Sequence, residues 1–317
     1  MGIGHIGNNR LMKNVLFNVQ KQLSQQADLF EQISSNKRIL DPSSDPLGTS
    51  QSMSLRDQSV RNTEYDDVIN TSELWTNISA TSLDNALETW KRVNEITITA
   101  VDGTKTAADR IAMAEELEQL LQHMVQVGNT TNGQRFIFGG SVTQTPPFST
   151  ETDAATGRIT GVYYQGNSFN QQVKSSDSGR TQVNVVGSNA GDPTVKGAFV
   201  DTTTNTDAFK IMVEIRDKLL SNDIIGISGP SGYLEKIETA GLNLTEAQVN
   251  LGGAQERQDL DRNRIIEQTS DIQEFLSEIE DADVAELILE LNNVQNVYEA
   301  ALAAGGRIMQ TGLLNYI

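Results

Sequence analysis

Residues 254–304 read AQERQDLDRNRIIEQTSDIQEFLSEIEDADVAELILELNNVQNVYEAALAA, a stretch with neither glycine nor proline. These two residue types interrupt helices more strongly than any others, because glycine is too flexible and proline lacks a backbone N–H. Their absence predicts long helices here. Fifty uninterrupted helical residues would extend about 75 Å at 1.5 Å per residue.

The apolar residues of this stretch are spaced as in a coiled coil, in alternating steps of three and four residues. One seam runs through Val284, Leu287, Leu291, Val294, Tyr298, Ala301, Gly305 and Ile308. An earlier seam, displaced by one position, runs through Ile265, Ile272, Leu276 and Ile279. The phase of the pattern therefore slips near Asp283.

Two further seams lie in the N-terminal half of the chain. The first, with a polar layer at its fifth position, consists of Met12, Leu16, Val19, Leu23, Gln26, Phe30 and Ile33. The second consists of Met113, Leu117, Leu120, Met124 and Val127. Gly128 follows it where a helix C-cap favours a left-handed residue. An ordinary bundle core explains any one seam, whereas seams at both chain ends favour a coiled coil formed by the termini.

The middle of the chain has the composition of a β-rich region. Residues 135–205 hold nine glycines and the β-branched or aromatic runs Val162–Tyr164 and Gln182–Val186, which predict short strands. Their formal charge is zero, whereas residues 1–134 carry −6 and residues 231–317 carry −11. The order of segments predicts a mainly α fold with a β insert, in which long antiparallel helices end in coiled-coil arms.

We therefore expect three domains. The ranges 1–45 and 285–317 form a terminal coiled-coil assembly domain. The ranges 46–134 and 206–284 form a long-helix bundle. The range 135–205 forms a small β-rich outer domain.

Charge is distributed unevenly between the two chain ends. Residues 1–27 contain Arg10, Lys13 and Lys21 and no acid. Near the other end, acids recur at i, i+4, i+7 and i+11, on one helical face: Glu267, Asp271, Glu274 and Glu278. Such a face is usually solvated, because like charges on it repel one another. The alternatives are that it meets a basic face of a neighbour, or that it pairs with the basic arm of its own chain.

Composition excludes several classes of function. The net charge of −18 argues against sequence-independent nucleic-acid binding, which needs clustered Lys and Arg. The chain has no cysteine and two histidines, and no run of 18 apolar residues. We expect no disulfide, no metal or other cofactor, no membrane insertion and no cleaved signal peptide. A cell-wall hydrolase on a helical stalk is the enzymatic alternative, but residues 135–205 offer no convincing nucleophile, metal set or acid pair, so no enzyme is expected.

Several segments of the chain together resemble the flagellin superfamily and, within it, the hook-associated proteins of the hook–filament junction. The N-terminal matches are Ser35–Ile39, Asp41–Pro46 and Gln51–Leu55, and the later ones are Asn129–Phe148, Tyr164–Asn167, Ser277–Asp283 and Gly312–Ile317. The resemblance implies an extracellular structural protein of the bacterial flagellum without catalysis. It also implies export in an unfolded state through the type III export apparatus by an uncleaved N-terminal signal, after a cytosolic export chaperone has held the C-terminal helices.

The resemblance further implies assembly into a ring. The partners would be copies of the chain itself, the preceding hook-associated junction protein and flagellin. The alternative is a flagellin-type filament subunit. The expected assembly interface combines the two terminal seams: Met12, Leu16, Val19, Leu23, Phe30, Ile33, Leu287, Leu291, Val294, Tyr298, Ala301 and Ile308.

The two Asp-Pro pairs predict a joint before the second helix. A helical backbone conformation is disfavoured for a residue that precedes proline, and Asp41 precedes Pro42. Asp45 is placed to cap the next helix with Pro46 at its first position. The segment is either a plain loop between helices or a joint that transmits the twist mismatch between hook and filament.

Overall fold

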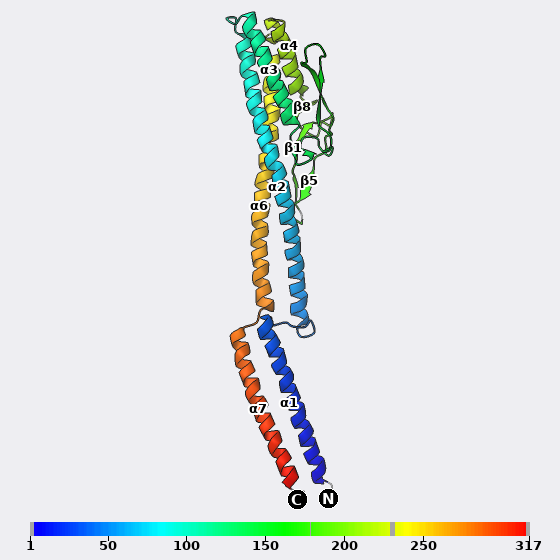
Figure 1. The fold of residues 1–317 in the computed structure, drawn as a ribbon, viewed down its shortest axis with the longest axis vertical. Helices are drawn as coiled ribbons and strands as arrows, with labels where there is room; N and C mark the ends of the chain where they lie inside the picture. The colour runs from blue at the N-terminus through cyan, green and yellow to red at the C-terminus, as the bar shows by residue number, and fades with distance from the viewer. Residues whose placement is uncertain (1–2, 178, 229–231, 315–317) are drawn as a thin grey trace. The chain divides into compact units, whose positions relative to one another are not determined.

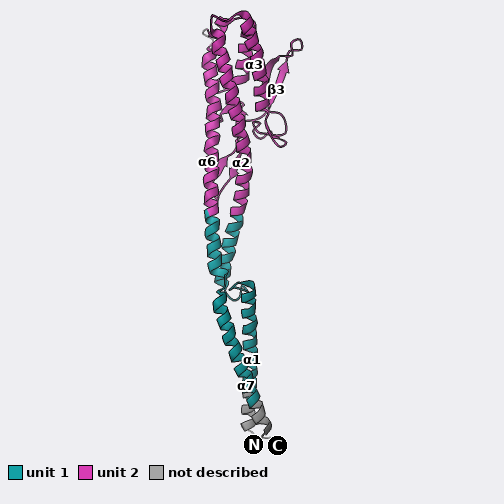
Figure 2. Cartoon of the chain, turned by 60° about the vertical axis from the view of Figure 1, so that its left-hand side comes forward, with its two compact units in different colours: residues 1–61, 267–317 teal, residues 62–266 magenta. Residues whose placement is uncertain are grey.

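The computed structural model describes residues 3–177, 179–228 and 232–314, with the side chains of 3–9, 11 and 308–314 left aside. The chain divides into two compact units (Figure 2). Unit 1 consists of residues 1–61 and 267–317, and unit 2 consists of residues 62–266. Two long helices, α2 (Pro46–Val101) and α6 (Tyr233–Glu280), contribute to both units.

Unit 1 is built from paired helices. α1 (Ile3–Ser35) packs along α7 (Val284–Leu314), as Figure 1 shows. The long helices expected over 254–304 are two, since α6 ends at Glu280 and α7 begins at Val284. The break falls where the apolar seam changes phase. Asp283 starts the new helix, since its Oδ1 accepts the backbone N–H groups of Ala285 and Glu286 at 2.9 and 3.2 Å.

Unit 2 contains a helical bundle of α2, α3 (Ala107–Gly128), α4 (Ala208–Leu220), α5 (Ile224–Ser228) and α6. The seam that runs from Met113 to Val127 belongs to the core of this bundle, where Leu117 and Met124 are fully buried. Trp90 on α2 is buried as well, and its indole N–H donates to the Ile237 carbonyl of α6 at 2.9 Å. This seam is therefore an ordinary bundle core.

Short strands lie along one side of the bundle in Figure 1. Three antiparallel pairs come first in the chain: β1 (Thr131–Asn132) with β2 (Arg135–Phe136), β3 (Phe148–Thr152) with β4 (Ile159–Tyr164), and β5 (Gln172–Lys174) with β6 (Arg180–Gln182). A three-stranded sheet follows, in which β8 (Gly197–Asp201) pairs parallel with β7 (Val186–Ser188) and antiparallel with β9 (Thr206–Asp207). The predicted fold class, mainly α with a central β-rich region, is confirmed.

Aromatic side chains join the strands to the helices of unit 2. The ring centroid of Phe148 on β3 lies 4.8 Å from that of Phe209 on α4 and 5.5 Å from that of Phe199 on β8. Phe138 meets Phe199 edge to face at 5.2 Å. All four rings are almost completely buried. The β-rich region and the helices α3 and α4 therefore share one core.

Two local predictions are wrong. Gly128 is the last residue of α3 and is not left-handed; a Cβ there would lie 2.7 Å from the Phe148 ring, so glycine is needed for close approach. The run Gln182–Val186 is not one strand. Its centre is held instead by the Asn184 amide, which accepts from the Gln171 N–H at 2.7 Å and donates to the Phe169 carbonyl at 2.9 Å.

Candidate assembly surface and helix joint

The helix pair of unit 1 buries only part of the predicted terminal seams. Val19 and Ile33 are half-buried, and Leu29, which the seam omitted, is almost completely buried. The α7 members of the seam are half-buried too: Leu287, Leu291, Val294, Tyr298 and Ala301. Ile308 lies outside the described side chains. One side of each helix therefore packs within the chain.

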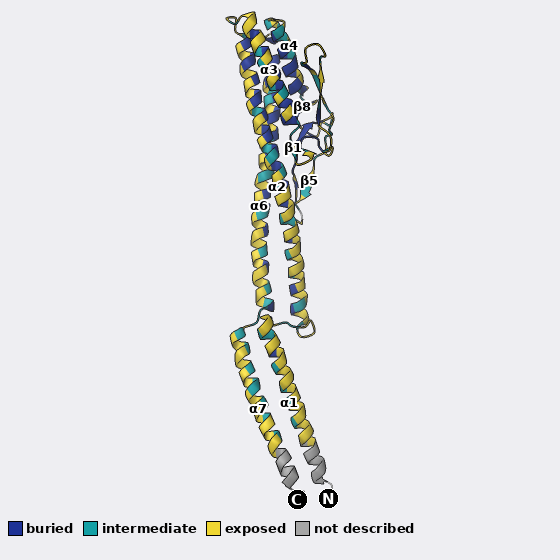
Figure 3. Ribbon diagram, viewed as in Figure 1, coloured by how far each residue is buried: buried dark blue, intermediate teal, exposed yellow. Residues whose placement is uncertain are grey.

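The other α1 members of the predicted seam remain at the surface. Most of α1 is coloured as exposed in Figure 3. Leu16, Leu23 and Phe30 are 58%, 55% and 51% exposed, and Met12 is 44% exposed. They recur along one side of α1, beside the side that packs on α7. We call these four residues the apolar stripe. α7 also exposes Leu289, at 72%. Aligned apolar side chains of this size on a surface indicate a site that binds another protein.

The segment between α1 and α2 forms the predicted joint. The Ser44 N–H donates to the Asp41 carbonyl at 3.0 Å, which closes a turn around Pro42. Asp45 caps α2 as expected, since its Oδ1 accepts the Gly48 N–H at 2.9 Å and Pro46 is the first helical residue. The local geometry of the joint follows the sequence. Its role in transmitting twist stays a prediction.

A cluster of charges ties this joint to the break between α6 and α7. Glu280 is 7% exposed and receives two hydrogen bonds from the Arg56 guanidinium, at 3.0 and 2.6 Å. Lys37 Nζ lies 3.2 Å from Glu280 and 2.8 Å from Asp281. The Arg56 hydrogen bonds lower the pKa of Glu280, although burial acts in the opposite direction. The pKa of Asp281 is lowered by hydrogen bonds from Lys37 and Ser277.

Backbone hydrogen bonds reinforce the same connection. The Arg38 N–H donates to the Glu280 carbonyl at 2.6 Å, and the Ala282 N–H donates to the Asn36 carbonyl at 3.3 Å. The Arg38 guanidinium also donates to the Ile279 carbonyl, at 2.8 Å from Nη2. Asn36 adopts a left-handed conformation, with φ of 55°, which asparagine tolerates better than most residues. These contacts therefore join the α1–α2 segment to the α6–α7 segment. We call the contacts of Lys37, Arg38 and Arg56 with Glu280 and Asp281 the lock.

Sequence reasoning missed this lock. It assigned the acids at 280, 281 and 283 to a superfamily motif, and Lys37 and Arg38 to another, without pairing them. The available signal was that a basic loop follows the first helix and an acidic loop precedes the last one. The proposed pairing of the basic arm with the acidic face of 267–278 in one chain is wrong, because α1 packs along α7 instead.

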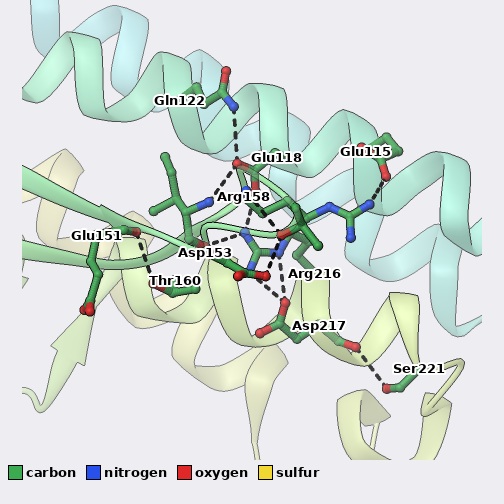
Figure 4. A network of polar contacts seen from close by, with 12 residues as sticks. Glu115, Glu118, Gln122, Glu151, Asp153, Arg158, Thr160, Arg216, Asp217 and Ser221 are labelled. Atoms are coloured by element: carbon green, nitrogen blue, oxygen red, sulfur yellow. Dashed lines mark hydrogen bonds and ion pairs between the residues drawn. The ribbon is translucent and has the colours of Figure 1, made fainter.

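A network of buried charges in unit 2 connects helices and a strand (Figure 4). Arg216 on α4 and Glu118 on α3 form an ion pair in which both side chains are at most 4% exposed. Arg216 also donates to the Ile159 carbonyl at 2.6 Å, and the Ile159 N–H donates to Glu118 at 3.1 Å. The pair thus fixes β4 to two helices, with its polar groups occupied by the protein itself.

Within the described residues, no group of three His, Cys, Asp or Glu side chains is placed to hold a metal ion. His123 is exposed beside the α3 core, as expected for a flanking residue. No helix in the described ranges is both long and apolar enough to cross a lipid bilayer.

The helical regions described above match known protein families. The sequence matches the bacterial flagellin N-terminal helical region over residues 6–143 and the bacterial flagellin C-terminal helical region over residues 234–317. Together the two matches cover most of the chain. The chain belongs to the flagellin family. Both sides of the lock lie inside the flagellin regions, whereas strands β3 to β9 lie between them.

Individual flagellin-family relatives narrow the comparison. The chain is 30% identical over 202 residues to flagellar hook-associated protein 3 of Salmonella typhimurium, and 31% identical over 150 residues to that of Escherichia coli K12. These alignments cover 59% and 47% of the chain. The chain spans 60% and 45% of the lengths of these two relatives.

A solved structure shares the fold. The flagellar junction protein FlgL from Legionella pneumophila superimposes with a TM-score of 0.56 at 16% identity, over 73% of this chain and all of that one. Since the identity is low, this likeness shows only that the two chains share a fold.

Proposed function

We propose that this chain is a structural adaptor of the bacterial flagellum, located extracellularly at the hook–filament junction. It joins the preceding hook-associated junction protein to the flagellin filament and assembles into a ring with copies of itself. The names of its relatives support this role, since they are hook-associated proteins. The observation that carries the proposal is the apolar stripe, which α7 leaves uncovered in unit 1.

The two terminal seams have different roles in this proposal. The α7 side chains, such as Leu291 and Val294, hold the α1–α7 pair together and set its shape. The apolar stripe contacts neighbouring subunits, because more than half of Leu16, Leu23 and Phe30 is uncovered. In this proposal the joint at Asp41–Pro46 fixes where α2 begins, while neighbouring subunits pack on α1.

We further propose that the chain is exported unfolded through the type III apparatus, with a chaperone on its C-terminal helices and without a cleaved signal peptide. Absence of cysteine supports this, because no disulfide can trap a partly folded form. The helices of unit 1 also bury little apolar surface on their own, so their unfolding before export costs little.

Deletion of the gene tests the role. The expected cells retain hooks, lack filaments and release flagellin into the medium. Normal hooks and filaments would contradict the proposal. If the chain were instead a flagellin-type filament subunit, the deletion would remove the filament protein itself from the medium.

Complementation of the deletion tests the surface. Leu23→Asp should fail to restore filaments, since it places a charge in the apolar stripe. Gln25→Asp is the matched control, because it adds the same charge at an exposed position of α1 outside the apolar stripe and should restore them. Equal amounts of both variants in the medium confirm that export is unaffected.

A further inference from the structure

One outer face of α1 carries positive charge and a phenylalanine. Arg10, Lys13, Phe17 and Lys21 fall within about 80° of one another at about 100° per residue. All four are exposed, and Phe17 is 67% exposed. Val15, which lies against Gly305 of α7, is on the opposite side of the helix. This basic face is therefore available to a partner while α1 remains packed on α7.

One outer face of the last part of α6 carries only negative charge. Glu267, Asp271, Glu274 and Glu278 fall within about 60° of one another around the helix. All four are exposed. Ile272, which is 4% exposed, points to the opposite, packed side. This acidic face lies in unit 1, as the basic face does.

Both faces lack counter-ions within their own copy. None of their seven charged side chains forms an ion pair with any other residue in the part of the chain that the structure describes. Like charges that share a helix face repel one another. A face of opposite charge would relieve that repulsion on both helices at once.

The dimensions of the two faces match. Each spans eleven residue steps, or about 16 Å of helix. In unit 1, α1 runs towards the lock and α6 ends at it, so the two helices approach it from opposite directions. Two copies in the same orientation, shifted along their length, therefore bring α1 of one antiparallel to α6 of the other. In that register Lys21 lies opposite Glu267, and Arg10 lies opposite Glu278.

We propose that the basic face of α1 in one copy docks on the acidic face of α6 in a second copy. Phe17 sits among the cations and meets the flank of the acidic face, where Phe275 is 51% exposed. The contact rests on the proposed self-assembly, and adds to it an ionic surface that sets the axial register between neighbours. The apolar stripe lies on a different side of α1, so both surfaces can be occupied together.

Disulfide cross-linking tests the contact directly, because the chain has no cysteine of its own. Full-length Phe17→Cys is mixed with full-length Asp271→Cys under mild oxidation at low ionic strength. The two positions are opposite each other in the proposed register. The control pair is Phe17→Cys with Asp57→Cys, an exposed acid of α2 outside the acidic face. The yield of mixed dimer is measured by non-reducing electrophoresis and mass spectrometry.

We expect about tenfold more mixed dimer from the proposed pair than from the control pair, the effect of a few exposed ion pairs. Adding 0.5 M salt should remove most of the difference by screening. Lys13→Glu with Lys21→Glu in the first copy should lower the yield to the control level. Glu267→Lys with Glu274→Lys in the second copy should then restore it.

Equal yields from the two pairs, or a charge swap that fails to restore cross-linking, would overturn the ionic contact. Circular dichroism of each variant verifies that it is folded before mixing. The junction role fails on separate grounds, if deletion of the gene leaves hooks and filaments normal.

Discussion

The two units of this chain bury their apolar side chains to very different extents. In unit 2, Phe138, Phe199 and Phe209 are at most 1% exposed. In unit 1, Leu16 and Phe30 are more than half exposed. A core that is closed on all sides supports independent folding. A pair of helices, in contrast, leaves part of each helix's apolar surface exposed to solvent. Unit 2 therefore closes its core within one copy, whereas unit 1 leaves apolar side chains uncovered, as the proposed assembly with neighbours requires.

Their charged groups differ in the same way. The Arg216–Glu118 pair of unit 2 is inaccessible to water, while in the lock of unit 1 only Glu280 is buried and its partners Lys37 and Arg56 are substantially exposed. Removing one member of a buried pair leaves an uncompensated charge, whereas exposed pairs contribute little. Substitutions in the two units should therefore have unequal effects.

The largest effect is expected from Glu118→Ala in unit 2. The substitution leaves Arg216 buried without its carboxylate and should lower the free energy of unfolding by about 3–5 kcal/mol. Both tryptophans, Trp75 and Trp90, lie in unit 2, so fluorescence-monitored urea unfolding reports on it. Glu115→Ala is the control, since its pair with Arg158 is more exposed and should cost less than about 1 kcal/mol. Equal losses would contradict the conclusion that the buried pair contributes more than the exposed one.

A smaller effect is expected from Leu29→Ala in unit 1. Leu29 is 6% exposed, so truncation should cost about 2–3 kcal/mol of local stability in the α1–α7 pair. Leu23→Ala, at an exposed position, should change it by less than about 0.5 kcal/mol in the monomer. Hydrogen exchange of α7 amides measures both. A loss at Leu23 as large as that at Leu29 would mean that the apolar stripe is already covered in the monomer.

The Asp45 cap should contribute about 1 kcal/mol to the local stability of the start of α2. Asp45→Ala removes the acceptor of the Gly48 N–H and should destabilise the start of α2 by that amount. Ser43→Ala, in the preceding turn, is the control. Faster exchange at residues 47–50 in the first variant alone is the expected result; no difference between the variants would exclude the cap.

The smallest effect is a dependence of unit 1 on pH. The lowered pKa of Glu280 means that its contribution is fully present above the ordinary glutamate pKa of about 4.3 and is lost as pH falls through the folded-state value. Acidification below about pH 5 should therefore lower the protection of amides around Glu280, measured relative to their intrinsic exchange rate at each pH. Glu280→Gln should flatten this dependence. An unchanged profile in the variant would assign the acid sensitivity to other groups.

Much of the architecture could be predicted from sequence, because glycine, proline and heptad spacing act locally. The break at 281–283 is visible in the sequence only as a phase slip of the apolar seam, since neither glycine nor proline marks it and Asp283 caps the new helix. Residues 135–205 were assigned a domain of their own, but Phe148 and Phe199 share a core with Phe209 of α4. Contacts between residues far apart in the chain produce no periodic pattern in the sequence, so they could not be predicted from it.

The assembly surface shows the same limit. Heptad spacing identified the terminal apolar residues but not which side of α1 the chain itself covers, so buried Leu29 was omitted and exposed Leu23 was included. The Arg56–Glu280 pair joins residues more than 200 positions apart, and net charge alone could not identify it. Which face remains free is decided by three-dimensional packing.

Hydrogen exchange on the purified monomer tests the central claim most directly. We expect weaker protection over residues 12–30 and 285–307 than over 107–128 and 208–220 in the monomer, and stronger protection of the terminal helices once subunits assemble. Protection of residues 12–30 in a verified monomer, equal to that of α3 and α4, would contradict the conclusion that unit 1 is completed by its neighbours.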